Sequence, residues 1–124
     1  MNIPENLKYT KSHEWVSDAG NGKVKVGITD HAQQELGDLV FIELPQQGDS
    51  FNQGDGLAVV ESVKATSDIM APVTGVVTGV NETLTDTPEA VNEDCYGAWL
   101  VEMEGVAEGL LSAEEYRAFL QEEA

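Results

Sequence analysis

The chain has 124 residues, of which 41% are hydrophobic, and 23 carboxylates against six Lys and Arg give a formal net charge of −17. This length fits one domain, expected over residues 1–124, and no apolar run approaches the roughly 20 residues that a membrane span needs. Such an acidic chain excludes binding to nucleic acid or anionic lipid, because cations must neutralise phosphates there, and it favours partners with basic surfaces.

The N-terminal segment, the single cysteine and the two histidines further limit the class of protein to which this chain can belong. Residues 1–10 have neither the apolar stretch of a signal peptide nor an Arg-rich amphipathic helix, so we expect a cytoplasmic protein of a bacterium. The single Cys95 excludes an internal disulfide and is expected to be a small, partly buried side chain. His13 and His31 are the only histidines, and no Cys/His spacing predicts a metal site.

Most of the chain is predicted to form short strands. Residues 23–28 alternate Val24, Val26 and Ile28 with Lys25 and Gly27, which is typical of a half-buried strand. Further runs, separated by Gly-, Pro- and Asp-containing turns, are predicted as strands at Leu39–Leu44, Leu57–Glu61, Ser67–Ala71, Gly75–Val80 and Trp99–Glu104. Regularly spaced short strands favour a mainly β fold, either a sandwich or a flattened barrel.

Two helices are expected within this β pattern. Thr29 can cap a short helix near residues 30–36, and Gly37 stands where a left-handed residue would end it. A second helix near residues 113–122 has a capping box formed by Ser112 and Glu115. Its apolar stripe, which we expect to pack onto the rest of the domain, consists of Tyr116, Phe119 and Leu120.

The most informative residue is Lys64, which lies at the connection between two strand-like arms. No other Lys or Arg occurs between Val26 and Tyr116, so this cation stands alone in an acidic region. A lysine that forms a Schiff base needs burial or neighbouring cations, whereas the charged residues near Lys64 are Glu61 and Asp68. These neighbours suit a lysine that another enzyme modifies. An ordinary solvated turn lysine is the alternative.

The segment around Lys64 closely resembles the lipoylation segment of glycine cleavage system H proteins. The matching residues run from Glu61 to Ile69 and continue through Ala71–Val77 to Asn81. The resemblance extends over nearly the whole chain. Further matches, in order, are Tyr9, His13–Val16, Gly27–Gln33, Leu36–Asp38, Leu44–Pro45, Gly48, Asn92–Asp94, Tyr96–Gly97 and Trp99.

The resemblance implies both the fold and the cofactor. Members of this family have two small antiparallel sheets in a flattened barrel, the barrel-sandwich hybrid of lipoyl and biotinyl domains, with the lysine on a protruding hairpin. Lipoic acid joined to Lys64 by an amide would supply the reactive atoms, so the chain would be a carrier and not an enzyme. The implied attachment hairpin comprises Glu61, Ser62, Val63, Ala65, Ser67 and Asp68.

The resemblance also implies the partners. Glycine decarboxylase (P protein) would load an aminomethyl group onto the lipoyl arm, and the aminomethyltransferase (T protein) would remove it. Dihydrolipoyl dehydrogenase (L protein) would reoxidise the dithiol, and a lipoate ligase or lipoyltransferase would attach the cofactor. A monomer is expected.

A loaded arm carries a cationic amine that water hydrolyses readily, so a carrier needs a sheltered groove with acidic or hydroxyl acceptors. The candidates are Ser12 and Glu14, in the matching N-terminal segment, and Asp68 beside the hairpin. His13 and His31 are weaker candidates. Ordinary surface polarity is the alternative explanation of these residues.

The chain departs from the family pattern at Cys95, which replaces a common Pro, and it is one residue shorter before Trp99. Glu102 and Glu104 stand where basic residues are frequent. These departures concern partner contacts and C-terminal packing, and they lie far in sequence from Lys64.

Other functions fit the sequence less well than that of a glycine cleavage H protein. A lipoyl domain of an alpha-keto acid dehydrogenase usually has Asp before its lysine, where this chain has Val63, and a biotin carrier has methionines where Val63 and Ala65 stand. Two alternatives stay open: an H-like protein that relays lipoate to other enzymes, and a regulatory relative without glycine cleavage activity. An independent enzyme has the least support, because no nucleophile–base pair, metal cluster or phosphate-binding loop is visible in the sequence.

Overall fold

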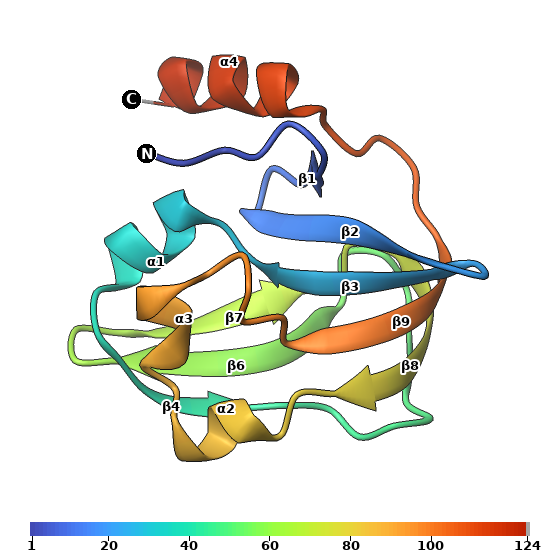
Figure 1. Ribbon diagram of the computed structural model, residues 1–124, viewed down its shortest axis with the longest axis horizontal. Coiled ribbons are helices and arrows are strands. Elements are labelled where there is room, and N and C mark those ends of the chain that lie inside the picture. Colours follow the sequence, from blue (N-terminus) through green and yellow to red (C-terminus); the bar gives the residue numbers. More distant parts are fainter. Residues whose placement is uncertain (124) are drawn as a thin grey trace.

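The computed structural model describes residues 1–123, so the last residue of the predicted domain lies outside the described part. Two antiparallel sheets face each other, and a C-terminal helix lies outside them (Figure 1). The larger sheet has six strands in the order β1-β2-β3-β9-β8-β5, and the smaller sheet has three in the order β4-β6-β7. The predicted mainly β fold of two small antiparallel sheets is confirmed.

The elements have the following bounds. The strands of the larger sheet are β1 (Lys8–Tyr9), β2 (Glu14–Gly20), β3 (Lys23–Ile28), β5 (Ser50–Phe51), β8 (Thr74–Val80) and β9 (Val101–Val106). The strands of the smaller sheet are β4 (Leu39–Glu43), β6 (Gly56–Ser62) and β7 (Thr66–Met70). The helices are α1 (Asp30–Leu36), α2 (Thr83–Asp86), α3 (Ala90–Glu93) and α4 (Ala113–Glu123).

Each strand that the sequence predicts is present, with its ends moved by two residues or fewer. The structure adds β1, β2, β5, α2 and α3. Strand β2 shows no alternation of buried and exposed residues at its start, because Glu14, Trp15 and Val16 are all buried in succession. The sequence pattern therefore did not predict it. Helices α2 and α3 have four residues each, which is too short for a repeating apolar pattern.

The predicted starts of both helices are confirmed by their capping bonds, and the predicted end of the first is confirmed by the conformation of its glycine. At the start of α1, the Thr29 hydroxyl oxygen accepts from the amide of Ala32 at 3.2 Å. At its end, Gly37 has φ 78°, a conformation that glycine adopts without strain. Before α4, the Ser112 amide donates to Glu115, and the Glu115 amide donates back to the Ser112 hydroxyl, which completes the capping box.

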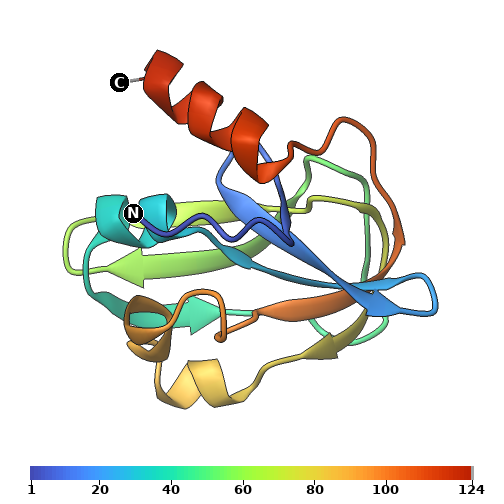
Figure 2. The same cartoon turned by 45° about the horizontal axis from the view of Figure 1, so that its top comes forward.

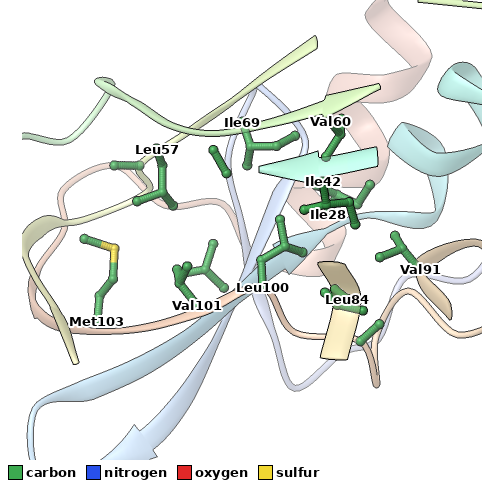
Figure 3. Close-up of a cluster of buried hydrophobic side chains, with 14 of the residues drawn as sticks. Ile28, Ile42, Leu57, Val60, Ile69, Leu84, Val91, Leu100, Val101 and Met103 are labelled. Carbon is green, nitrogen blue, oxygen red and sulfur yellow. The ribbon is translucent and has the colours of Figure 1, made fainter. Parts of the chain in front are cut away.

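The main core fills the space between the two sheets. Figure 3 shows Ile42, Val60 and Ile69 of the smaller sheet on one side and Leu100 and Val101 on the other. Leu84 of α2 and Val91 of α3 join this cluster at its margin. Burial of one such aliphatic side chain stabilises the fold by roughly 1.5–3 kcal/mol, so this shared core holds the sheets face to face.

A second cluster joins α4 to the N-terminal segment, which runs past that helix (Figure 2). The Tyr116 ring of α4 stacks on the Tyr9 ring of β1, with centroids 4.7 Å apart. Phe119 and Leu120 pack against the same cluster, which confirms the predicted apolar stripe. Helix α4 is thereby fixed to the first strands of the chain.

Candidate functional site

The site is built around the hairpin between β6 and β7. The last pair of the ladder is Glu61 with Thr66, and the Ser62 amide donates to the Ala65 carbonyl at 2.8 Å. The Ser62 hydroxyl oxygen accepts from the amides of Lys64 and Ala65, both at 3.1 Å. One serine side chain therefore orders the turn that presents Lys64.

Lys64 is exposed in the turn of this hairpin, and the β6–β7 hairpin reaches the side of the molecule on which α1 lies (Figure 1). The preceding residue Val63 donates its amide to the Asp38 carbonyl at 3.0 Å, which joins the tip to the chain just before β4. The aliphatic stem of Lys64 passes over Gly37. A Cβ added to Gly37 would lie 3.2 Å from Lys64 Cε, so glycine leaves the room that the lysine occupies.

The other predicted hairpin residues differ in their surroundings. Glu61, Ala65 and Asp68 are exposed, Val63 is 67% exposed, and Ser67 is half-buried. Ser67 and Asp68 lie on β7 and face a neighbouring hollow. Three further residues of the hairpin do not line this hollow: Glu61, Val63 and Ala65.

This hollow, called the groove below, has a volume of about 370 Å³. One wall is the α1 helix, another is β7, and the third is the turn before β2. Its lining residues are Ser12, His13, His31, Ala32, Glu35, Leu36, Ser67, Asp68 and Ile69. The fold thus brings Ser12 and Asp68 to one groove beside the lysine hairpin, together with both histidines.

Glu14 does not line the groove but lies behind Ser12, with 1% of its surface exposed. Its carboxylate accepts from the hydroxyls of Thr10 and Ser12, each at 2.6 Å, and from the Met70 amide at 3.4 Å. Burial raises the pKa of Glu14 above its ordinary value, and these three hydrogen bonds oppose the rise. A buried acceptor thus holds the Ser12 hydroxyl in place.

Two features of the site have no clear signal in the sequence. His13 has φ 73° and hydrogen-bonds through Nδ1 to the Tyr116 hydroxyl at 2.8 Å, across 103 residues of sequence. The His13 and His31 rings also lie 4.5 Å apart. Sequence spacing could not reveal these contacts, because they join α4, α1 and the turn before β2.

Cys95 lies apart from this site, in the main core. Burial, with the nearby carboxylates of Asp30 and Asp94, raises the pKa of its thiol to about 12. It thus stays a neutral thiol at physiological pH.

In the described part of the chain, no group of three or more His, Cys, Asp and Glu side chains could hold a metal ion. Within residues 1–123, no helix is long and apolar enough to cross a membrane.

A two-sheet β fold that presents one lysine on an ordered hairpin, with a groove beside it, fits the class of carriers that hold a covalently attached cofactor. Comparison with known proteins identifies the family. A family model described as "Glycine cleavage H-protein" matches residues 7–123. The chain therefore belongs to the glycine cleavage H-protein family, the lipoyl-carrying component of glycine cleavage.

Individual relatives agree with this assignment. The chain is 59% identical over 102 residues to the glycine cleavage system H protein of Burkholderia vietnamiensis, covering 82% of this chain and 81% of that protein. It is 51% identical over 128 residues to the Nitrosomonas europaea protein of the same name, covering 100% and 99%. A crystal structure of the Mycobacterium marinum glycine cleavage system H protein superposes with a TM-score of 0.89 at 40% identity, covering 98% and 100%.

Proposed function

We propose that Lys64 carries lipoic acid as an amide and that this chain moves the aminomethyl group of glycine from glycine decarboxylase to the aminomethyltransferase. The observation that carries the proposal is the exposed Lys64 on its ordered turn. Between Val26 and Tyr116 it is the only cationic side chain in the sequence. A modifying enzyme that recognises the β6–β7 hairpin therefore meets a single candidate amine.

The residues around Lys64 fit a long attached arm. The hairpin leaves the amine in solvent, and Gly37 leaves space along the stem of the lysine. The groove of about 370 Å³ begins on the adjoining helix with Leu36 and Glu35 and continues to Ser12. Lipoate bound to Lys64 would supply a cyclic disulfide, which opens as it takes up the one-carbon unit and two electrons, and which is restored when the dithiol left after release of that unit is oxidised.

The polar walls of the groove suit the cationic amine of a loaded arm. Asp68 offers a carboxylate on one wall, and Ser12 offers a hydroxyl oxygen on another. Because the Ser12 hydroxyl donates to Glu14, its oxygen lone pairs are free to accept a further hydrogen bond. Glu14 therefore acts through Ser12, whereas Asp68 acts directly.

The electrostatics of the chain support docking to several enzymes in turn. The net charge of −17 attracts basic surfaces over distances of about a Debye length and speeds encounter. We therefore expect glycine decarboxylase, the aminomethyltransferase, dihydrolipoyl dehydrogenase and a lipoate ligase to approach Lys64 with basic surfaces. The chain's own task is to present and shelter the arm, while catalysis resides in these partners.

Lipoylation of Lys64 is tested by intact mass and peptide mapping after incubation with lipoate, ATP and a lipoate ligase. The wild type should gain one lipoyl group on Lys64, and Lys64→Arg should gain none. Lys8→Arg is the matched control, because Lys8 is also an exposed lysine, and it should be modified like the wild type. An unmodified wild type, under conditions that lipoylate a known H protein, would overturn the proposal.

A further inference from the structure

The Tyr116 hydroxyl lies where three elements of the fold meet. It is 2.8 Å from His13 Nδ1, in the turn before β2, and 2.8 Å from the Thr29 hydroxyl at the start of α1. Tyr116 itself belongs to α4 and is fully buried, as is Thr29. One phenol therefore joins the C-terminal helix to two segments that are far from it in sequence.

Both of these segments continue into walls of the groove. His13 and the adjacent Ser12 line it directly. Thr29 caps α1 through the Ala32 amide, and α1 forms the opposite wall from His31 to Leu36. The Tyr116 hydroxyl thus connects the two walls at their common end, although Tyr116 does not itself line the groove.

The turn at His13 needs such support. A non-glycine residue with positive φ has a strained backbone, and His13 has φ 73°. Its amide donates to the Thr10 carbonyl at 3.2 Å, and its carbonyl accepts from the Thr29 amide at 3.1 Å. The side-chain bond to Tyr116 adds a third attachment, which holds the imidazole against the groove.

The three hydrogen bonds made by the Thr29 and Tyr116 hydroxyls can form together, because each hydroxyl donates its one proton and accepts another. The Ala32 amide donates to the Thr29 oxygen, which leaves the Thr29 proton to donate to Tyr116. The Tyr116 proton can then be donated to His13 Nδ1, which requires the neutral imidazole with its proton on Nε2. Loss of the phenol hydroxyl would leave both His13 and Thr29 without this bond.

We propose that Tyr116 is a positioning residue of the groove, and that its hydroxyl fixes the orientation of the His13 imidazole and of the Thr29 cap of α1. This inference rests on the proposed function, because the groove matters only if it shelters an arm on Lys64. Tyr116 is fully buried and does not line the groove. It acts through His13 and Thr29, so removal of its hydroxyl should loosen the His13 side of the groove, while the main-chain bond from Thr29 to His13 stays and Lys64 remains fully modifiable.

The test compares Tyr116→Phe with Tyr9→Phe. Tyr9 is a matched control because it lies in the same stacked pair, and its hydroxyl donates to the Pro4 carbonyl, away from the groove. Both variants keep the stacked rings and lose one phenol hydroxyl. Urea unfolding of each verifies that both are folded at the assay temperature.

The first measurement uses protein without lipoate. Nitrogen chemical shifts of the imidazoles report which ring nitrogen of His13 is protonated, and Tyr116→Phe should change them while Tyr9→Phe should not. The second measurement is the rate at which the aminomethyl-loaded arm hydrolyses. Tyr116→Phe should shorten its lifetime roughly fivefold, the ratio that corresponds to one neutral hydrogen bond, and Tyr9→Phe should leave it unchanged.

A double-mutant cycle sharpens the test. His13→Gly accepts the positive φ without strain and removes the imidazole. It should shorten the arm's lifetime, and adding Tyr116→Phe should shorten it less than Tyr116→Phe does in the wild type, because the bond is already absent. If Tyr116→Phe matches Tyr9→Phe in both measurements, the inference is wrong. If the loaded wild-type arm hydrolyses as fast as on denatured protein, the sheltering role in the proposed function fails instead.

Discussion

The Lys64 hairpin and the groove beside it differ in the sequence separation of the contacts that build them. The turn is ordered by Ser62, which bonds to residues two and three positions away. The groove depends on bonds such as Glu14 to Met70, across 56 residues, and His13 to Tyr116, across 103. The hairpin is therefore a local structure, whereas the groove exists only when the whole chain has folded.

This difference separates two parts of the proposed function. Presentation of Lys64 needs only the hairpin and its attachment to Asp38, so modification of the lysine should tolerate changes elsewhere. Protection of a loaded arm needs the distant contacts. Substitutions that weaken those contacts should therefore shorten the lifetime of the arm before they reduce lipoylation of Lys64. Substitutions in the two regions should therefore have separable effects, and those in the framework behind the groove should cost the most stability.

The largest effect is expected for Gly27→Ala, in the framework behind the groove. A Cβ at Gly27 would lie 2.4–2.6 Å from three atoms of the Trp15 ring, next to Glu14 on β2. Such overpacking costs roughly 1–3 kcal/mol of unfolding free energy, measured by urea denaturation. The arm's lifetime should fall as well, while the extent of lipoylation should not change.

Gly79→Ala is the matched control for that substitution. It too lies in a strand of the larger sheet, but its Cβ would meet only the Glu102 Cβ at 3.7 Å, an ordinary contact. Its free energy of unfolding should stay within about 0.5 kcal/mol of the wild type. Equal losses of unfolding free energy in Gly27→Ala and Gly79→Ala would contradict the role assigned to the Trp15 contact.

Gly37→Ala tests the hairpin side of the comparison. Its positive φ should cost roughly 1–2 kcal/mol, and the added Cβ would crowd the Lys64 stem at 3.2 Å. Gly22→Ala has nearly the same φ, 76°, with nothing within 4 Å of the added atom. Both variants should lose stability, but only Gly37→Ala should slow lipoylation of Lys64, measured by mass against time.

Ser62→Ala should have a smaller and strictly local effect. It removes the oxygen that accepts from the Lys64 and Ala65 amides, while the bond from the Ser62 amide to Ala65 stays. Because the turn is exposed, water replaces the lost bonds, and we expect a cost of about 0.5–1 kcal/mol. Amide hydrogen exchange should quicken at Lys64 and Ala65 only. Faster exchange at His13 would show that the hairpin and the groove are coupled.

The smallest effect concerns the pH dependence of stability. Because burial raises the pKa of Glu14 in the folded protein, the folded state binds this proton more tightly than the unfolded chain does. Glu14 therefore destabilises the fold progressively as pH rises from its ordinary pKa, near 4.5, through its folded value.

Glu14→Gln removes this titration. The unfolding free energy of the variant, relative to the wild type, should rise with pH over that interval, as measured by urea denaturation at each pH. A relative stability that stays constant or falls with pH would contradict the buried position assigned to Glu14.

The same difference in sequence separation explains what could be predicted from the sequence. The hairpin, the Thr29 and Ser112 caps and the strand at 23–28 are encoded by neighbouring residues, and all appear in the structure. The placement of Ser12 and Asp68 on one groove followed from resemblance to the family and from no local pattern. Burial of Glu14 behind Ser12 was not foreseeable, because a carboxylate in an apolar strand gives no periodic signal.

The role of Tyr116 illustrates the limit of sequence analysis. Its position after Ser112 and its spacing to Phe119 predicted a packed ring, which the structure confirms. Nothing in that pattern indicates where the hydroxyl lies. Its contacts to His13 and Thr29 depend on how α4 crosses β1, which only the assembled fold determines.

The central claim is that lipoyl-Lys64 accepts the one-carbon unit from glycine. It is tested most directly by the exchange of the glycine carboxyl carbon with dissolved carbon dioxide, catalysed by a glycine decarboxylase that is supplied with this chain. Lipoylated wild type should support exchange that saturates with its concentration, and Lys64→Arg, treated identically, should support none. Wild type that is fully lipoylated on Lys64 but supports no exchange would contradict the account and favour a protein that relays lipoate to other enzymes.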